Sequence, residues 1–259
     1  MKLSVQELCF SYEPGCPVLS GLSCDAQDGE LLAVLGANGA GKTTLFRCLM
    51  GAQTGYTGEI LVDGTPLSQL SPRQRARRIA YIPQTHRPTF GYTVLETALM
   101  GTTRQLGAFA QPRQAQIDTA MAALEQVGMA DKAQRNAAHL RGGEFQLVLI
   151  ARAMAQQAQV LVMDEPTSAL DYGNQLRILS QVQQLCRDGY AVLLSTHDPQ
   201  HALRFSHRVL ALDHGHAAAF GDTAKVLTPA LLHRLYGVAV DFVSAAGQTV
   251  IVPGLGGEA

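Results

Sequence analysis

The sequence predicts an α/β fold in which helices cover both faces of a parallel sheet, with a helical insertion in the middle of the chain. Three observations support this prediction. Short apolar runs alternate with helical segments, a pattern typical of parallel sheets. The apolar run at 31–35 leads into a glycine-rich turn followed by a helix. Over residues 93–157 alanine, glutamine and leucine dominate and β-branched runs disappear, which favours helices.

The elements expected along the chain follow from local signals. Ser71 and Pro72 suit the start of a helix, and Gly51 suits the end of one. LCFSYE and GEILVDG are expected to be antiparallel strands packed at one edge. In chain order the expected strands are LCFSYE at 8–13, LLAVL at 31–35, GEILVDG at 58–64, IAYIP at 79–83, QVLVMDEP at 159–166, YAVLLSTHD at 190–198 and RVLALDHG at 208–215. The expected helices are 43–50, 72–78, 93–101, 114–128, 143–156 and 173–187, and 254–259 is expected to fray.

Composition restricts the class of protein. The 259 residues are 47% hydrophobic and 16% charged, which predicts a packed domain rather than disorder. A net charge of -1 argues against a dedicated nucleic-acid binder, so the arginines of 72–78 are expected on a solvated face. The scattered cysteines are expected to be reduced thiols. No secretory leader and no apolar run of about 18–20 residues is visible, so the protein is expected to be soluble and to need a membrane-spanning partner if it works at a membrane.

The strongest functional signal is GANGAGKT at 36–43, which fits the pattern G-x-x-x-x-G-K-[ST] between a strand and a helix. The glycines let the backbone wrap around phosphates, and Lys42 neutralises the β- and γ-phosphates of a nucleotide. The Thr43 hydroxyl can bind the Mg²⁺ that bridges those phosphates. The residues expected to bind nucleotide here are Gly36, Asn38, Gly39, Gly41, Lys42, Thr43 and Thr44.

Further polar residues follow other predicted strands. Asp164 and Glu165 come directly after VLVM, at the strand end where parallel α/β sheets bind ligands. Asp164 would hold Mg²⁺ through its water shell, and Glu165 would orient or activate the attacking water. His197 ends a third core strand at the same sheet edge, where it could contact a γ-phosphate. His214 and His216 are interpreted as an exposed turn rather than a metal site.

Two signals are weak when taken alone. Gln84 follows the strand IAYIP, and its amide could reach Mg²⁺ or the attacking water. Tyr12 ends a strand and could stack on a purine base, although an ordinary strand tyrosine would look the same.

Taken together and in this order, the motifs resemble the nucleotide-binding subunit of an ABC transporter over nearly the whole chain. The set is Gly36–Thr43, Gln84, Arg141-Gly142-Gly143-Glu144, Val160–Glu165, Ser168-Ala169-Leu170-Asp171 and His197. The resemblance implies a P-loop NTPase fold: a RecA-like core with a small antiparallel β subdomain at 1–92 and 158–259, and a helical subdomain at 93–157 that carries the signature turn.

The resemblance also implies roles for single residues. Tyr12 resembles the aromatic residue that stacks on adenine, and Gln84 resembles the residue that links the nucleotide site to the membrane subunit. Glu165 resembles the catalytic carboxylate, and His197 the γ-phosphate contact. Ser168–Asp171 resembles the loop that crosses between two subunits, and the nucleotide-binding residues implied outside the 36–43 loop are Tyr12, Arg141, Gly142, Gly143 and Asp171. The catalytic set is thus Glu165, His197 and Gln84, and the expected Mg²⁺ ligands are Thr43, Gln84 and Asp164.

The turn at 140–144 departs from the family pattern. It usually reads Leu-Ser-Gly-Gly-Gln and closes over ATP held by the other subunit, whereas here it reads LRGGE. Arg141 could bind the γ-phosphate directly, could hold the dimer interface open and slow turnover, or could point into solvent while Gly142 and Gly143 still present their N–H groups. We favour the second or third interpretation, and hydrolysis is still expected, although its rate could be slow.

The resemblance implies an ATP- and Mg²⁺-dependent ATPase of a bacterial importer. The expected cargo is an iron–siderophore, haem, cobalamin or molybdate/tungstate. The expected partners are transmembrane permease subunits, a second copy of the chain and, indirectly, a periplasmic or surface substrate-binding protein, with no nucleic acid. The expected location is peripheral, on the cytoplasmic face of the inner membrane. Two alternatives stay open: a non-transport ABC-type ATPase, and a slow regulatory nucleotide-binding subunit, which Arg141 suggests.

Overall fold

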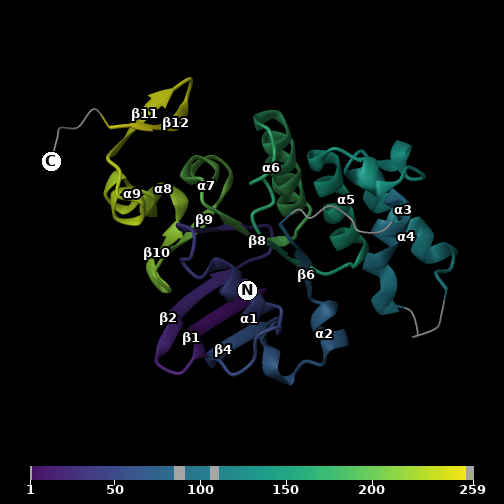
Figure 1. Ribbon diagram of the computed structural model, residues 1–259, viewed down its shortest axis with the longest axis horizontal. Coiled ribbons are helices and arrows are strands. Elements are labelled where there is room, and N and C mark those ends of the chain that lie inside the picture. The colour runs from purple at the N-terminus through teal and green to yellow at the C-terminus, as the bar shows by residue number, and fades with distance from the viewer. Residues whose placement is uncertain (1, 85–90, 106–110, 255–259) are drawn as a thin grey trace. The chain divides into compact units, whose positions relative to one another are not determined.

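A computed structural model describes residues 2–84, 91–105 and 111–254 (Figure 1). The chain divides into two compact units, one formed by Met1–Gln69 with Ala191–Ala259 and the other by Leu70–Tyr190. The division into a core and a helical subdomain with boundaries at 93 and 157 stays a prediction. Among the described residues, no helix combines the length and apolar character that a membrane span requires.

The first unit contains an antiparallel sheet with the strand order β2-β1-β4-β5. Its strands are β1 (Leu3–Glu13), β2 (Cys16–Ala26), β4 (Thr57–Val62) and β5 (Thr65–Pro66). The antiparallel pairing of β1 with β4 confirms the prediction for LCFSYE and GEILVDG, whereas β2 was not predicted. At Gly58 a side chain is excluded, because a Cβ there would lie 2.3 Å from the carbonyl oxygen of Glu7.

The same unit contributes four neighbouring strands to a mostly parallel sheet, in the order β10-β9-β3-β8. Its strands are β3 (Leu31–Leu35), β8 (Ala191–Thr196), β9 (Arg208–Asp213) and β10 (His216–Asp222). Every residue of β3 is buried, as expected for a central parallel strand. Leu35 lies opposite Thr196, so Gly36 and His197 leave the sheet at the same edge, as the sequence predicted. The helix α1 (Lys42–Leu49) follows the glycine-rich turn after β3.

Arg208 joins the two sheets of the first unit. Its guanidinium donates to both carboxylate oxygens of Asp25, at 3.0 and 3.1 Å, and lies 4.3 Å from the ring centroid of Phe220. The hydrogen bond from Arg208 holds the pKa of the Asp25 carboxyl below its ordinary value. This bidentate pair thus fixes the end of β2 against the start of β9.

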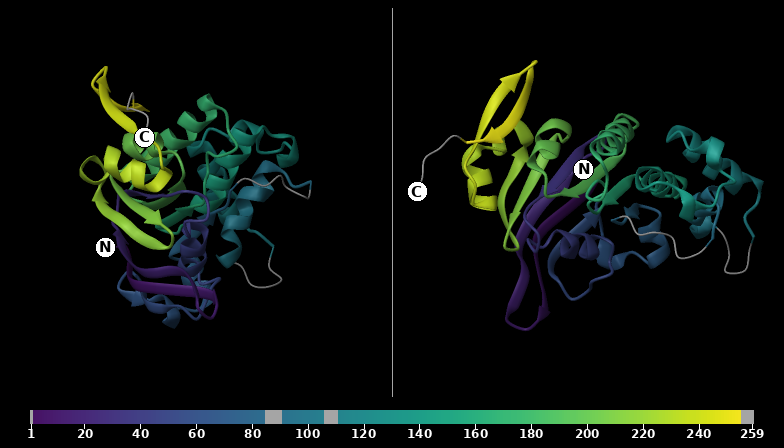
Figure 2. Two further views of the ribbon diagram at one scale, coloured as in Figure 1. Left: turned by 60° about the vertical axis from the view of Figure 1, so that its left-hand side comes forward. Right: turned by 45° about the horizontal axis from the view of Figure 1, so that its top comes forward.

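The C-terminal part of the first unit is a helical layer followed by a β-hairpin that was not predicted. The helices are α7 (Pro199–Phe205), α8 (Thr223–Val226) and α9 (Pro229–Tyr236), and the hairpin strands are β11 (Val240–Ala245) and β12 (Gln248–Pro253). Figures 1 and 2 show the hairpin in yellow directly beyond α9. The N–H of Gly254 donates to the Ala239 carbonyl and closes the hairpin, and the rest of the predicted tail lies outside the described residues.

The second unit combines a parallel strand pair with helices. The strands are β6 (Ile79–Ile82) and β7 (Val160–Met163), and the helices are α2 (Pro72–Ala76), α3 (Val94–Leu99), α4 (Gln114–Gln126), α5 (Gly142–Ala155) and α6 (Tyr172–Arg187). Predicted capping is confirmed at Ser71, whose hydroxyl accepts from the N–H of Gln74. The helix α5 is the apolar centre of this unit, since nearly all of its residues are buried.

Candidate nucleotide-binding site

The turn at 36–43 has the conformation that a phosphate-binding loop needs. Gly39 and Gly41 adopt left-handed φ values of 83° and 101°, which a residue with a Cβ rarely adopts. The ammonium of Lys42 donates to the carbonyl oxygens of Gly36 at 2.7 Å and Ala37 at 3.1 Å, and the residue is only 6% exposed. Because α1 begins directly after Gly41, its first N–H groups and positive dipole end lie at the loop.

Neighbouring residues pack closely against the glycines of this loop. A Cβ on Gly36 would lie 2.6 Å from the carbonyl oxygen of Leu212, and one on Gly41 would lie 2.9 Å from Cδ2 of Leu19. The N–H of Gly215 donates to the Ala40 carbonyl at 3.2 Å. The exposed turn predicted at His214 and His216 is therefore confirmed, and Gly215 between them stabilises the loop through this hydrogen bond.

Tyr12 lies beside the phosphate-binding loop in the first unit. Its hydroxyl is 3.3 Å from the hydroxyl of Thr44 and accepts a hydrogen bond from Arg47 at 3.2 Å. The edge of its ring meets Phe10 at 88°, and half of the residue is exposed. The Thr44 contact and the Arg47 charge lower the pKa of the phenol against the opposing effect of burial. A ring that is fixed at its hydroxyl end and belongs to a half-exposed residue is suited to stack on a base.

In the second unit Asp164 and Glu165 leave the carboxyl end of β7. The N–H of Asp164 continues the sheet by donating to Ile82, and its carboxylate accepts from the Tyr81 hydroxyl at 3.2 Å. Asp164 is 7% exposed. Glu165 has a φ of 42°, a left-handed conformation that costs free energy for a residue with a side chain. Such local strain gathers at functional sites, which supports a role for Glu165.

Gln84 lies next to the loop that follows Glu165. Its amide nitrogen donates to the Ser168 hydroxyl at 2.9 Å, and that hydroxyl donates to the Glu165 carbonyl at 3.1 Å. Ser168 thus connects the end of β6 with the end of β7. The structure brings Gln84, Asp164 and Glu165 to one edge of this strand pair, as the sequence predicted.

The signature turn packs against the start of α6. Arg141 is the exposed residue before α5, and Gly142 and Gly143 form the first turn of that helix. A Cβ on Gly143 would lie 2.4 Å from Oδ1 of Asn174, whose amide donates to Asp171 at 2.8 Å. Asp171 caps α6 and its pKa is lowered, first by the Asn174 N–H and least by the charge of Arg141. The structure therefore brings the turn and Asp171 together.

Glu144 fixes the same turn from the other side. Its carboxylate accepts from the N–H of Arg141 at 3.1 Å and pairs with the Lys132 ammonium at 2.7 Å. The Lys132 hydrogen bond, followed by the Arg141 N–H, holds the pKa of Glu144 below its ordinary value. Arg141 is thus compatible with a well-formed helix start, because the capping is done by Glu144 rather than by a hydroxyl at 141.

Sequence reasoning missed the residues that support the site through contacts distant in the chain. These are Arg47 beside Tyr12, Tyr81 beside Asp164, Lys132 beside Glu144 and Asn174 beside Gly143. No local motif marks them. Tyr81, however, lies in the strand IAYIP, which directly precedes Gln84, and this placement is a signal that could have been used.

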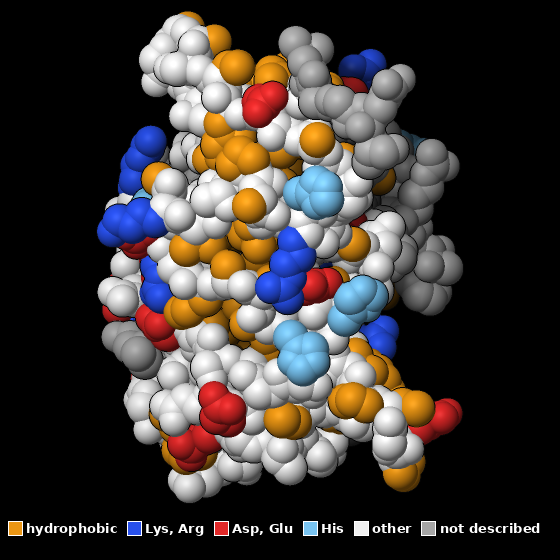
Figure 3. All heavy atoms as spheres, turned by 90° about the vertical axis from the view of Figure 1, so that its left-hand side faces the viewer, with side chains coloured by type: hydrophobic (Ala, Val, Ile, Leu, Met, Phe, Trp, Pro, Cys, Tyr) orange, Lys and Arg blue, Asp and Glu red, His pale blue; other side chains and the backbone are white. Residues whose placement is uncertain are grey.

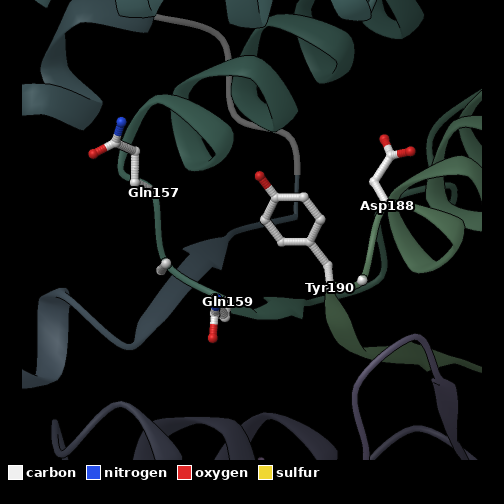
Figure 4. A pocket seen from close by; sticks show the side chains of 6 residues that line it. Gln157, Gln159, Asp188 and Tyr190 are labelled. Atoms are coloured by element: carbon white, nitrogen blue, oxygen red, sulfur yellow. The ribbon is translucent and has the colours of Figure 1, made fainter.

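A pocket of the second unit lies away from these residues (Figure 4). It has a volume of about 290 Å³ and is lined by Gln157, Ala158, Gln159, Asp188, Gly189 and Tyr190. Burial raises the pKa of the Tyr190 phenol. Since Gln159 precedes β7 whereas Asp164 follows it, the pocket lies at the opposite end of that strand from the candidate site.

We expect Gly143→Ala to destabilise the protein by about 1–3 kcal/mol, because the new methyl group must displace the Asn174 side chain. Urea unfolding measures the change. The control is Gly142→Ala, where the nearest atom is the flexible Cδ2 of Leu170 at 3.3 Å. In an Asn174→Gly background the cost of Gly143→Ala should shrink; an equal cost in both backgrounds would show that Asn174 is not its cause.

The loop at 36–43, its strand and its helix define a P-loop nucleotide-binding protein. A family model described as ABC transporter matches residues 19–168, which is more than half of the chain. An uncharacterised ABC transporter ATP-binding protein of Haemophilus influenzae is 40% identical, with 91% of this chain and 89% of that protein covered. This chain belongs to the ABC transporter family, as one of its ATP-binding cassettes.

Relatives with named cargo are similar over most of their length. The hemin import ATP-binding protein HmuV of Myxococcus xanthus is 37% identical over 89% of this chain and 88% of its own. The molybdate import ATP-binding protein MolC of Haemophilus influenzae is 34% identical over 90% and 87%. A solved inward-facing putative metal-chelate type ABC transporter superimposes with a TM-score of 0.86 at 33% identity, covering 97% of this chain and 96% of that one.

These comparisons confirm the predicted family, the P-loop NTPase fold and the enzyme class, an ATPase of the ABC type. They concern the chain as a whole, and the roles of its single site residues stay predictions.

Proposed function

We propose that this chain is the ATP-binding and ATP-hydrolysing subunit of an ABC importer that takes up a metal chelate or an oxyanion. The observation that carries the proposal is a nucleotide-binding loop with buried Lys42 on a chain that also holds a signature turn and a strained Glu165. The import names of HmuV and MolC support the direction of transport. The cargo is an iron–siderophore, haem, cobalamin or molybdate/tungstate.

The residues present fit ATP with Mg²⁺. The donors and dipole at the start of α1 suit phosphate, and Tyr12 offers a ring face for the base. Thr43, Gln84 and Asp164 are the oxygen-bearing side chains that would hold Mg²⁺, which neutralises phosphate charge when bound. Glu165 polarises the attacking water, and His197 contacts the γ-phosphate.

The partners are transmembrane permease subunits, a second copy of the chain and, indirectly, a substrate-binding protein. In the homodimer the 36–43 loop of one copy and the 140–144 turn of the other enclose each ATP. Gln84 transmits the closure of this dimer to the permease. The chain is peripheral on the cytoplasmic face of the membrane. On the face drawn in Figure 3, lysine and arginine side chains lie among acidic, histidine and apolar ones. The net charge of -1 supports a function without nucleic acid.

The test is uptake in a cell that lacks the natural chain and carries either the natural sequence or the Glu165→Gln variant. Radiolabelled haem, iron–siderophore, cobalamin and molybdate are supplied in turn. We expect the uptake of one of them to require the natural sequence and to fail with the variant. If none depends on the chain while the purified protein hydrolyses ATP, the importer proposal fails and a non-transport ATPase is favoured.

We expect Arg141→Ser to change ATP turnover by no more than about twofold to threefold, because the Arg141 side chain is exposed and Glu144 already caps the helix. Turnover is measured on purified protein at matched concentration beside an Arg113→Ser control at the start of α4. A tenfold gain would show that Arg141 slows the enzyme and would favour the regulatory alternative. A tenfold loss would show that its guanidinium contributes a phosphate contact.

A further inference from the structure

The C-terminal layer of the first unit contacts the segment that carries His197. The Tyr236 hydroxyl, at the end of α9, donates to the His197 carbonyl oxygen at 3.2 Å. Tyr236 also packs partly buried against the core cluster that contains Ala202 of α7 and Leu232 of α9. A residue 39 positions further along the chain is therefore fixed to the backbone of the candidate γ-phosphate contact.

The hairpin holds the other end of the same segment. Gln200 in the first turn of α7 accepts from the N–H of Ile251 at 2.8 Å and donates to the Thr249 carbonyl at 3.4 Å. This pair of bonds attaches α7 along the edge of β12, as another strand would. Phe242 and Ile251 lie opposite each other and pack against the same core cluster, so the hairpin is anchored through apolar side chains.

The segment between these two attachments, residues 197–200, is also stabilised by local hydrogen bonds. The N–H of Asp198 donates to Thr196 at 3.0 Å, and the Asp198 carboxylate accepts from the N–H of Gln200 at 2.8 Å. Thr196 is the buried last residue of β8, whereas His197 is exposed. The backbone of His197 is thus fixed by β8 before it and by C-terminal residues around it, while its side chain stays accessible.

We propose that Tyr236 is a positioning residue for His197, and that the C-terminal hairpin fixes His197 through Gln200. The inference rests on the proposed function, in which His197 contacts the γ-phosphate. Tyr236 holds the carbonyl of His197 at one point and the hairpin holds α7 at another, so the imidazole is presented at the sheet edge shared with Gly36. In this proposal Tyr236 and the hairpin act on His197 and not on the nucleotide itself.

The test is the Tyr236→Phe variant, which removes one hydroxyl and leaves the ring in place. We expect kcat for ATP to fall by roughly twofold to tenfold, the effect of one lost hydrogen bond. ADP lacks the γ-phosphate, so its affinity should stay unchanged, while the affinity for the nonhydrolysable analogue AMP-PNP should fall with kcat. Tyr190→Phe, in the pocket of the second unit, is the matched control and should keep the natural kcat.

Two further variants separate the inference from the function on which it rests. Gln200→Ala should also lower kcat, because Gln200 acts through His197. In a His197→Ala background, Tyr236→Phe should cause no further loss of kcat, since Tyr236 acts through the same residue. If His197→Ala is slow but Tyr236→Phe is normal, the inference fails and the function stands. If His197→Ala turns over normally, the inference fails while the ATPase function stands, and if the natural protein does not hydrolyse ATP, both fail. Equal losses of ADP and AMP-PNP affinity would indicate general disruption and overturn the inference.

Discussion

Glu165→Gln should reduce ATP hydrolysis at least about a hundredfold while leaving ATP binding intact, because a glutamine amide cannot accept the proton of the attacking water. The substitution is nearly isosteric and tolerates the left-handed backbone about as well as glutamate does, so the fold should persist. With hydrolysis blocked, ATP and Mg²⁺ should hold two copies together. Phosphate release measures the first effect, and light scattering measures the mass of the trapped dimer.

The matched control is Glu125→Gln, which makes the same chemical change on the exposed surface of α4. It should keep both the natural turnover and the natural mass. Normal turnover by Glu165→Gln would remove Glu165 from the catalytic role. A slow variant that stays monomeric with ATP and Mg²⁺ would instead contradict the closed dimer.

Lys42→Ala should weaken ATP binding by roughly tenfold to a hundredfold, the range expected when a charged hydrogen-bond donor is removed. The ammonium is buried against the carbonyl oxygens of Gly36 and Ala37, at the centre of the loop, so nothing nearby in the loop replaces its charge. The loop also loses the bonds that draw its two ends together. Isothermal titration with ATP and Mg²⁺ measures the change in affinity.

Lys225→Ala is the control for that experiment, because Lys225 is an exposed lysine of the same unit whose partner is Asp222. Its removal should leave ATP affinity unchanged. An affinity of Lys42→Ala within twofold of the natural value would mean that the 36–43 loop does not bind the phosphates.

Local patterns predicted the parts of the site that lie in continuous stretches. The buried strand, turn and helix lie within the continuous stretch from Leu31 to Leu49, and β7 with Asp164 directly after it is equally local. The same-edge placement of Gly36 and His197 could be predicted because parallel strands bring their carboxyl ends to one side.

The parts that could not be predicted depend on weak turns and long-range contacts. The hairpin β11–β12 turns at Ala246 and Gly247, with φ values of 50° and 73°, whereas Asn-Gly would have marked such a turn clearly. Its strands are mostly exposed and alternate poorly, so no periodic signal identified them. The contact of Tyr236 with His197 spans 39 residues and leaves no trace in the spacing of either.

The glycines at the two ends of the phosphate-binding loop are required by their neighbours in the protein. The Leu212 carbonyl oxygen excludes a side chain at Gly36, and the Val18 carbonyl oxygen together with a φ of 101° disfavours one at Gly41, whether or not a phosphate is ever bound. A variant of this chain that no longer hydrolysed ATP would therefore still need both glycines to fold, whereas Lys42 and Glu165 could be replaced. The two glycines thus report on the fold of the loop, whereas Lys42 and Glu165 report on the hydrolysis of ATP.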